Sequence, residues 1–464
     1  MNGLALTFTL LSALALLLVP RRWAFLPLLA GVCYITYGQG IEVGALNFTV
    51  VRILIFTGFV RAISRGERIV GGFIVLDWVM IAWGLAAAVS SLGHDDPSGA
   101  LIYRLGLFYD CGGVYLLVRT WCRDVEDAVH LLRVCAFLLV PVAFEMLTEK
   151  LTGQNSFSVF GGVSLESAVR EGRIRAQGPF MHPILAGTVG AVCLPLLLGF
   201  WQKHRWSAVL GSASCLTMVF ACGSSGPMMS AIFAIGALFL WRYRTHMRTL
   251  RWMAVLTYIG LDLVMKVPAY YLLGRFDLAG GSTGWHRAEL INSGIRHLDE
   301  WWLAGTDYTR HWMPTGVSWN PNHTDITNHY LAMGVLGGLP LMILFIVVMV
   351  IGFSYVGQSI RAIPETEQES QRFVWALGAS LFANAATCIS VSYFDQSFVF
   401  LYLTLGSIAS VKSMVTRKKS ALETEAPASP TASQVTKLPI AYRPGFNTNW
   451  STSHLHSHHE DNPR

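Results

Sequence analysis

Two arginines stand two residues apart immediately before an apolar run, in the stretch "RIRAQGPFMHP". Arg173 and Arg175 precede a Gly-Pro pair and a His-Pro pair. Backbone N–H groups at a helix start have no partner within the helix, and the helix dipole adds partial positive charge there. The planar guanidinium group can donate two hydrogen bonds to one phosphate. The stretch therefore predicts an anion site at a helix start, although the same arginines could contact lipid headgroups.

A second polar segment, from residue 274 into the next apolar run, combines arginines with tryptophans. Residues 287–297 fit a helix that carries charged side chains on its polar faces. Tryptophans beside a membrane form an interfacial belt, and flat aromatic faces with polar neighbours also suit sugar rings. Both interpretations of the tryptophans stay open. The residues concerned are Arg275, Arg287, Arg296, Arg310, Trp285, Trp301, Trp302, Trp312 and Trp319.

The same segment ends in "NPNHTDITNHY", which gathers side chains able to move a proton. A histidine, His323 or His329, can take a proton from a sugar hydroxyl, and Asp325 can orient the reacting groups. The alternative is a capped helix start in which Asp325 or Thr327 is the N-cap.

The composition places these polar segments in a membrane protein. The chain has 464 residues, of which 53% are hydrophobic and 13% are charged, with a net charge of +6. Soluble proteins carry roughly 25% charged residues. No nucleic-acid-binding motif accompanies the positive charge, so loops on the cytoplasmic side of a membrane explain it better.

Apolar runs of about 17–25 residues recur along the chain, each long enough to cross a bilayer. They predict an all-α polytopic fold with about 12–13 transmembrane helices. Arg52 and Arg104 interrupt the third and fifth runs, which are the weakest. The predicted centres are Leu14, Leu29, Leu54, Met80, Leu107, Phe137, Val192, Leu216, Phe233, Tyr258, Leu344, Leu381 and Leu403.

Polar segments divide the chain into six parts. Residues from about 415 onwards are rich in Ala, Ser, Thr and Pro and cannot bury enough apolar surface to order themselves. The predicted parts are transmembrane helices 1–147, an outer loop 148–182, transmembrane helices 183–267, a large outer loop 268–329, transmembrane helices 330–414 and a disordered cytoplasmic tail 415–464.

Basic residues in the short loops predict the orientation. They fall in alternate loops, from Arg21 and Arg22 to the cluster at 417–419, whereas the loop 92–99 is acidic. Because cytoplasmic loops carry an excess of Lys and Arg, both long polar segments and the turn 223–226 should face outward.

The order of these motifs resembles the O-antigen ligase and polysaccharide polymerase superfamily of bacterial membrane glycosyltransferases. The resemblance covers roughly residues 170–350 and extends to the pattern of spans. The matching positions are Arg175, Gly178, Phe180 and Pro183 before a middle span, Ser224–Pro227 in the next outer turn, Arg287, Trp301 and Gly305 in the large loop, and Asn328, Tyr330, Leu331 and Gly334 where that loop closes.

Two positions depart from the family pattern. The family's arginine in the Ser-Arg-Gly turn is Ser225 here, and its histidine at the loop end aligns with Thr327. His329 is displaced from that position by two residues, so His329, His323 or no histidine could serve as the base.

The resemblance implies a polyprenyl-diphosphate-linked glycan as donor and a growing glycan or lipid A core as acceptor, without a cofactor or a required metal. It implies a protein of the bacterial inner membrane with a periplasmic active site. Arg175 and Arg287 would hold the diphosphate, and His329, His323 or Asp325 would take the acceptor proton. The residues predicted to bind substrate are Arg173, Gly178, His182, Arg296, Trp301, Asn328 and Tyr330.

Two other classes of function compete with an enzyme. A transporter or flippase would carry polar or broken helices near the bilayer midplane, and most interior runs here are apolar. A non-catalytic subunit of a polysaccharide export complex would be consistent with Ser225 and Thr327.

Overall fold

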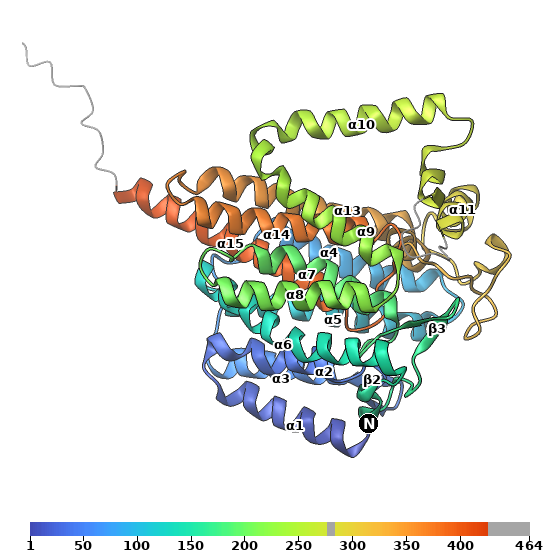
Figure 1. Ribbon diagram of the computed structural model, residues 1–464, viewed down its shortest axis with the longest axis horizontal. Helices are drawn as coiled ribbons and strands as arrows, with labels where there is room; N and C mark the ends of the chain where they lie inside the picture. The colour runs from blue at the N-terminus through green and yellow to red at the C-terminus, as the bar shows by residue number, and fades with distance from the viewer. Residues whose placement is uncertain (276–283, 426–464) are drawn as a thin grey trace, which may run out of the picture. The chain divides into compact units, whose positions relative to one another are not determined.

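The chain folds into a bundle of helices with short polar connections (Figure 1). The computed structural model describes residues 1–275 and 284–425, and side chains up to residue 418. The described residues form the α-helices α1 (Gly3–Leu18), α2 (Phe25–Tyr34), α3 (Val50–Ser64), α4 (Val75–Ser90), α5 (Pro97–Trp121), α6 (Val125–Thr152), α7 (Pro183–Leu198), α8 (Arg205–Ala221), α9 (Ser225–Phe239), α10 (Met247–Val264), α11 (Gly284–Arg296), α12 (Leu298–Trp301), α13 (His329–Ala362), α14 (Gln368–Thr387) and α15 (Phe398–Glu425).

Each of the thirteen predicted centres falls inside one of the helices α1–α10 and α13–α15. Within the described residues, six helical stretches are long and apolar enough to cross a membrane, which supports a helical membrane protein. They are Val75–Gly93, Pro97–Trp121, Val125–Thr152, Ser225–Val264, His329–Ala362 and Phe398–Lys418, and the shorter apolar helices are Gly3–Leu18 and Pro183–Leu198.

Two antiparallel hairpins depart from the all-α prediction. One pairs β1 (Gly40–Val43) with β2 (Leu46–Thr49), and the other pairs β3 (Ala168–Arg170) with β4 (Arg173–Arg175). Strands of three or four residues carry little periodic signal, so apolar patterning does not reveal them. The 3-10 helices are η1 (Arg21–Trp23), η2 (Ser91–Gly93), η3 (Ser156–Phe160), η4 (Leu240–His246), η5 (Ala269–Arg275) and η6 (Arg310–Trp312).

The connections gather at two opposite ends of the bundle. One end, called the loop-rich end here, holds β2, β3, α11 and the N-terminus on the right of Figure 1. Side-chain contacts join distant segments there, for example His94 with Asp307 and Asn2 with Val159. The other end, called the basic end, joins loops through pairs such as Arg22 with Asp124. Successive helices therefore alternate in direction, as the basic residues predicted.

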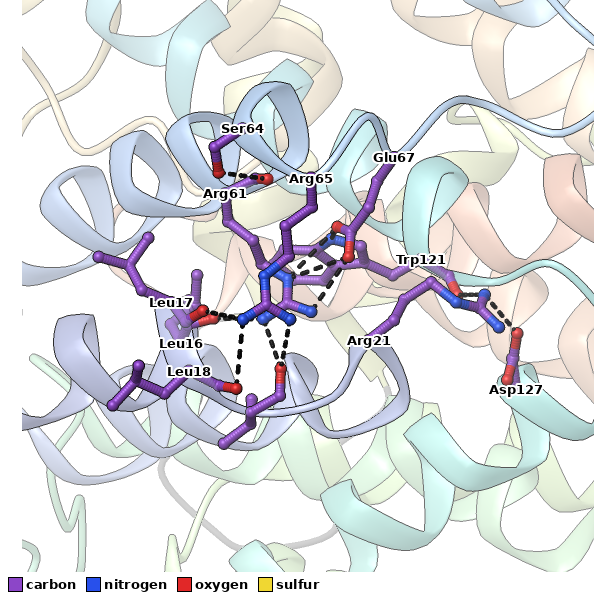
Figure 2. Close-up of polar contacts among 11 residues, drawn as sticks. Leu16, Leu17, Leu18, Arg21, Arg61, Ser64, Arg65, Glu67, Trp121 and Asp127 are labelled. Carbon is purple, nitrogen blue, oxygen red and sulfur yellow. Dashed lines mark hydrogen bonds and ion pairs between the residues drawn. The ribbon is translucent and has the colours of Figure 1, made fainter.

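Arginines at the basic end hold helix termini as well as contributing charge (Figure 2). The buried Arg61 donates from Nη1 to the carbonyls of Leu16 and Val19, at 2.6 and 2.7 Å, and pairs with Glu67 at 3.0 Å. Arg65 donates to the carbonyl of Leu17 at 2.5 Å. The last carbonyls of α1 have no partner within the helix, and its C-terminus carries partial negative charge, so guanidinium groups stabilise that end.

Three arginines inside the spans have partners. Arg52 forms a two-pronged pair with Asp110, with Nη2 at 2.9 Å, and the buried Arg119 pairs with Asp77 at 2.9 Å. Arg104 donates from Nε to the carbonyl of Leu336 at 3.1 Å. Such pairing explains how α3 and α5 tolerate the arginines that weakened their apolar pattern.

A kink in α13 fixes the segment that follows α12 on the bundle. Gly338 has a φ of 74°, a conformation that favours glycine. The amide of Leu339 donates to the carbonyl of Trp302 at 2.8 Å, and the amide of Thr306 donates to the carbonyl of Val335 at 3.0 Å. Backbone groups freed by the kink are thus bonded to the segment that follows α12, which fixes its position.

Helix α10 differs from the other predicted spans, because none of its eighteen residues is buried. Figure 1 shows it apart from the bundle, joined to it through η4 and η5. Its apolar side chains, such as Trp252 and Leu256, are exposed. A helix with this exposure requires lipid or another apolar partner around it.

The predicted tail boundary at 415 lies too early. Helix α15 continues to Glu425. The stretch 415–425 contains Lys, Ala, Leu and Glu, which are strong helix formers, and this propensity extends the preceding apolar helix. The rest of the predicted tail lies outside the described residues.

Candidate functional site

Arg175 is held against the start of α9 by its own hairpin. The strand β4 ends where the amide of Ala176 donates to the carbonyl of Ala221 at 3.1 Å. The Nη2 atom of Arg175 then donates to Oγ of Ser224 at 2.5 Å, and its Nε donates to the carbonyl of Cys222 at 3.4 Å. The predicted arginine and the predicted outer turn therefore meet.

The register of the hairpin gathers three arginines on one face. Ala168 lies opposite Arg175, and Arg170 lies opposite Arg173. Residues directly opposite in an antiparallel pair share a face, and so do residues two apart on one strand. Burial lowers the pKa of Arg175, and the positive charge of Arg170 lowers it further. Like charges placed this closely favour an anion beside them.

The backbone between β4 and α7 is fixed by carboxylates. One oxygen of Glu149 accepts the amides of Gln177 and Gly178 at 3.0 and 2.8 Å, and Asp395 accepts the amide of Met181 at 2.9 Å. Gly178 has a φ of 55°, which explains why a glycine follows the arginines. The predicted role of Gly178 in substrate binding is better described as shaping this turn.

His182 is the N-cap of α7 and faces the arginines. Its Nδ1 accepts the amide of Ile184 at 3.1 Å. Burial lowers the pKa of His182 to about 4, and the charges of Arg175 and Arg170 add to this shift. The ring is therefore neutral at pH 7, with its proton on Nε2. In this state His182 can donate one hydrogen bond to an anion.

Arg287 reaches the same helix start from α11. A Cβ built on Gly226 would lie 3.6 Å from Nη2 of Arg287, and one built on Gly223 would lie 3.3 Å from Cγ of Arg175. Gly223 and Gly226 are three positions apart, so their Cα atoms are separated by at most about 11 Å. Arg175 and Arg287, which are 112 positions apart in the sequence, thus converge on one turn at the loop-rich end. Together with Arg170, His182 and Ser224 they form what we call the arginine cluster.

The N-terminus of α9 contributes to this cluster. Its N-cap, Ser224, makes no side-chain capping bond, and the first helical residues Ser225, Gly226 and Pro227 are buried. The first N–H groups of a helix have no partner within it, and they carry the positive end of the dipole. A diphosphate is the kind of anion that guanidinium groups and such a helix start bind together.

Asp325 is the predicted proton acceptor that lies beside Arg287. Nε2 of His286 lies 3.1 Å from the Asp325 carbonyl oxygen. Loss of water around the carboxylate raises the pKa of Asp325, while the nearby His286 and the positive charge of Arg287 oppose that rise. A carboxylate with a raised pKa is a better proton acceptor than an ordinary aspartate.

The two predicted histidines contact residues outside the arginine cluster. His329 is buried at 7% exposure, and its ring packs edge-on against Phe345 and Tyr393. Its Nδ1 accepts the Tyr393 amide at 3.3 Å, so the structure places it in the core. His323 lies 3.3 Å from Thr309 within the outer segment, where burial lowers its pKa.

Three further residues predicted to bind substrate make hydrogen bonds within the fold. Trp301 is buried and donates from Nε1 to the carbonyl of Gly294 at 2.8 Å. Tyr330 donates to the carbonyl of Ala385 at 2.9 Å. Asn328 accepts the amide of Leu331 at 3.0 Å and is the N-cap of α13, so the predicted caps Asp325 and Thr327 are wrong.

Arg173 and Arg296 are exposed. Arg173 shares the hairpin face of Arg175, and the charge of Arg296 acts on Tyr270 and Tyr271 in η5. Arg170 belongs to the cluster but was missed by the sequence analysis. Its signal was the "REGR" turn, which places arginines on both strands of a hairpin.

Comparison of the sequence with protein-family models gives no match, and comparison with curated proteins gives no significant match.

Proposed function

We propose that this protein is a membrane glycosyltransferase that moves a glycan from a polyprenyl diphosphate to an acceptor hydroxyl. The observation that carries the proposal is the convergence of Arg175 and Arg287 on the turn that begins α9. A helical membrane protein with such a cluster at one end can meet a lipid-linked diphosphate at the bilayer surface. The acceptor would be a growing glycan or lipid A core, and the site would face the periplasm.

Catalysis would rest mainly on the leaving diphosphate. As the acceptor oxygen forms a bond to the anomeric carbon, the bond from that carbon to the phosphate oxygen breaks, and the diphosphate keeps the electron pair. Arg175 and Arg287 would bind the charge that develops on it. Loss of one preorganised donor of this kind typically costs about 2.7–4 kcal/mol in transition-state stabilisation.

Neutral donors would complete the diphosphate site. His182 holds its Nδ1 on the amide of Ile184, so its Nε2–H is directed to other partners. The buried start of α9 adds the positive end of a dipole. A neutral imidazole avoids adding a third charge next to Arg170 and Arg175, which keeps the free site stable.

Asp325 would accept the proton of the acceptor hydroxyl. The Asp325 carboxylate lies next to Arg287 and has a raised pKa. It can therefore take this proton as the glycosidic bond forms. We propose Asp325 in place of His329 because His329 is buried in the core, and in place of His323 because that ring contacts Thr309.

The experiment uses purified full-length protein in lipid with a defined polyprenyl-diphosphate-linked oligosaccharide, and the products are analysed by mass. A longer glycan on the lipid would identify a polymerase, and a glycan on an added lipid A core would identify a ligase. Arg175→Ala and Arg287→Ala should each lower the rate about a hundred- to a thousandfold. Arg175→Lys should recover part of it, because it keeps the charge but loses the planar fork.

Arg310→Ala is the matched control in the same outer segment. Arg310 is exposed, and it donates to the carbonyls of Met313 and Pro314. Its loss should leave the rate unchanged. The proposal would be contradicted if the lipid-linked substrate stayed unchanged with every acceptor tested, or if Arg175→Ala and Arg287→Ala both showed wild-type rates. Either result would favour transport or a non-catalytic role.

A further inference from the structure

Three side chains with metal-binding chemistry meet in the large outer segment, away from the arginine cluster. His297 follows α11, Glu300 lies in α12, and His311 lies in η6. One nitrogen of each ring and one carboxylate oxygen lie within 4.8 Å of one another. Nε2 of His311 is 2.9 Å from Oε1 of Glu300. Two histidines and a carboxylate are a ligand set that suits Zn²⁺.

One pair of the three ligands already has nearly the spacing that a bound ion requires. Ligand atoms about 2.0–2.1 Å from a tetrahedral Zn²⁺ lie roughly 3.3 Å from one another. The pair formed by His311 and Glu300 is already near that separation. Glu300 and His311 are exposed, so their side chains can rotate and water can supply a fourth ligand.

Neighbouring groups orient two of the three ligands. Nδ1 of His297 donates to the carbonyl of Ser293 at 2.8 Å, which fixes the tautomer and leaves Nε2 for a metal. Nε1 of Trp312 donates to Oε2 of Glu300 at 2.9 Å, and the Trp312 ring stacks on His297 with centroids 5.6 Å apart. Metal-binding histidines and carboxylates are commonly oriented in this way by a second layer of hydrogen bonds.

We propose that His297, Glu300 and His311 form a binding site for a single zinc-like divalent cation that fastens the outer segment. The ion would join the end of α11 to η6 and close the chain between residues 297 and 311. Ten residues of helical rise separate Arg287 from His297, or about 15 Å. The ion therefore lies outside the diphosphate site, and its role is structural.

The test uses the full chain with His454, His456, His458 and His459 replaced by alanine, because a cluster of histidines binds metal by itself. After treatment with a chelator, this protein should bind one Zn²⁺ per chain, and Co²⁺ should give the visible absorption of a four-coordinate site. Zn²⁺ should also raise its thermal unfolding temperature.

His297→Ala, His311→Ala and Glu300→Gln should each weaken Zn²⁺ binding more than Trp312→Phe does. Trp312→Phe keeps the ring but removes the hydrogen bond to Glu300, and should weaken binding about tenfold. His323→Ala, in the same segment and outside this set, should bind like the parent. Glu300→Gln is nearly isosteric and separates loss of a ligand from loss of folding.

Absence of bound Zn²⁺ in the parent would overturn the proposal and leave an ordinary pair between His311 and Glu300. Binding that survives in His297→Ala and His311→Ala would also overturn it. Because metal content, cobalt absorption and thermal unfolding are all measured without substrate, the result does not depend on the proposed transferase activity.

Discussion

At the scale of single residues, the cluster separates charge from proton transfer. Arg175 and Arg287 supply positive charge, and the neutral His182 supplies a donor without adding to the repulsion. Asp325 is the carboxylate next to this group. Loss of transfer rate at low pH, the acid limb of the pH profile, should therefore reflect protonation of Asp325 and not of a histidine.

The transfer rate should decrease as the pH is lowered, because Asp325 then takes up a proton and can no longer accept one from the acceptor. Because its pKa is raised, this loss should begin at a higher pH than an ordinary aspartate would give, whereas His182, with a pKa of about 4, stays neutral over most of that range. Measured kcat/KM from about pH 4 to pH 8 should show the limb. Asp325→Asn should lower the rate about a hundredfold or more and remove the limb.

His182→Gln serves as the comparison for that profile. It should lower the rate but keep the acid limb, since the proton acceptor is still present. An acid limb of unchanged position in Asp325→Asn would show that another group accepts the proton.

At the scale of elements, the hairpin of β3 and β4 determines where Arg175 points. Its turn contains Glu171 at a φ of 51° and Gly172 at a φ of 72°. Both residues occupy the left-handed region, in which the turn matches the twist of the two strands. Backbone strain in that turn should therefore displace the arginines on the two strands.

Gly172→Val should reduce transfer without removing any contact with substrate. Nothing lies within 4 Å of a Cβ built on Gly172, so the effect comes from the backbone alone. A left-handed conformation costs a residue with a side chain roughly 1–2 kcal/mol, and a β-branched residue more. The turn should change conformation, and the rate in the purified-protein assay should fall at least tenfold.

Gly66→Val is a matched control at the basic end. Gly66 has a φ of 61°, and a Cβ built on it also meets nothing within 4 Å. The strain is thus similar, but it acts at the opposite end of the bundle. Equal losses of rate in Gly172→Val and Gly66→Val would show that general destabilisation, and not the arginine face, explains the effect.

At the scale of the whole molecule, alternating helix directions place all parts of the cluster at one end. The pattern of basic loops predicts that the basic end faces the cytoplasm. The eight native cysteines are all buried, so background labelling of thiols should be low. Single cysteines at exposed positions can therefore report which side each end faces.

Ser318→Cys at the loop-rich end should react with a membrane-impermeant maleimide in cells whose outer membrane has been permeabilised. Gln202→Cys at the basic end should react only after the inner membrane is also opened. Both side chains are exposed. The opposite order of labelling would reverse the orientation and place the cluster in the cytoplasm.

Length and polarity predicted the helices well, because thirteen apolar runs each became a helix. Alternation of basic loops also predicted that Arg175 and Arg287 would share an end. The residues around them were harder to predict. His329 and Trp301 stand in polar sequence next to a span, yet tertiary packing buries both. Arg170 entered the cluster through hairpin register, which short strands do not reveal in the sequence.

The central claim is that Arg175 and Arg287 act on one diphosphate, and a double-mutant cycle on the transfer rate tests it most directly. Arg175→Ala and Arg287→Ala should each slow transfer about a hundred- to a thousandfold. The double variant should be faster than the product of the two losses predicts, with a coupling energy of about 0.5–3 kcal/mol. Losses that multiply, or single variants as fast as the wild type, would contradict the account.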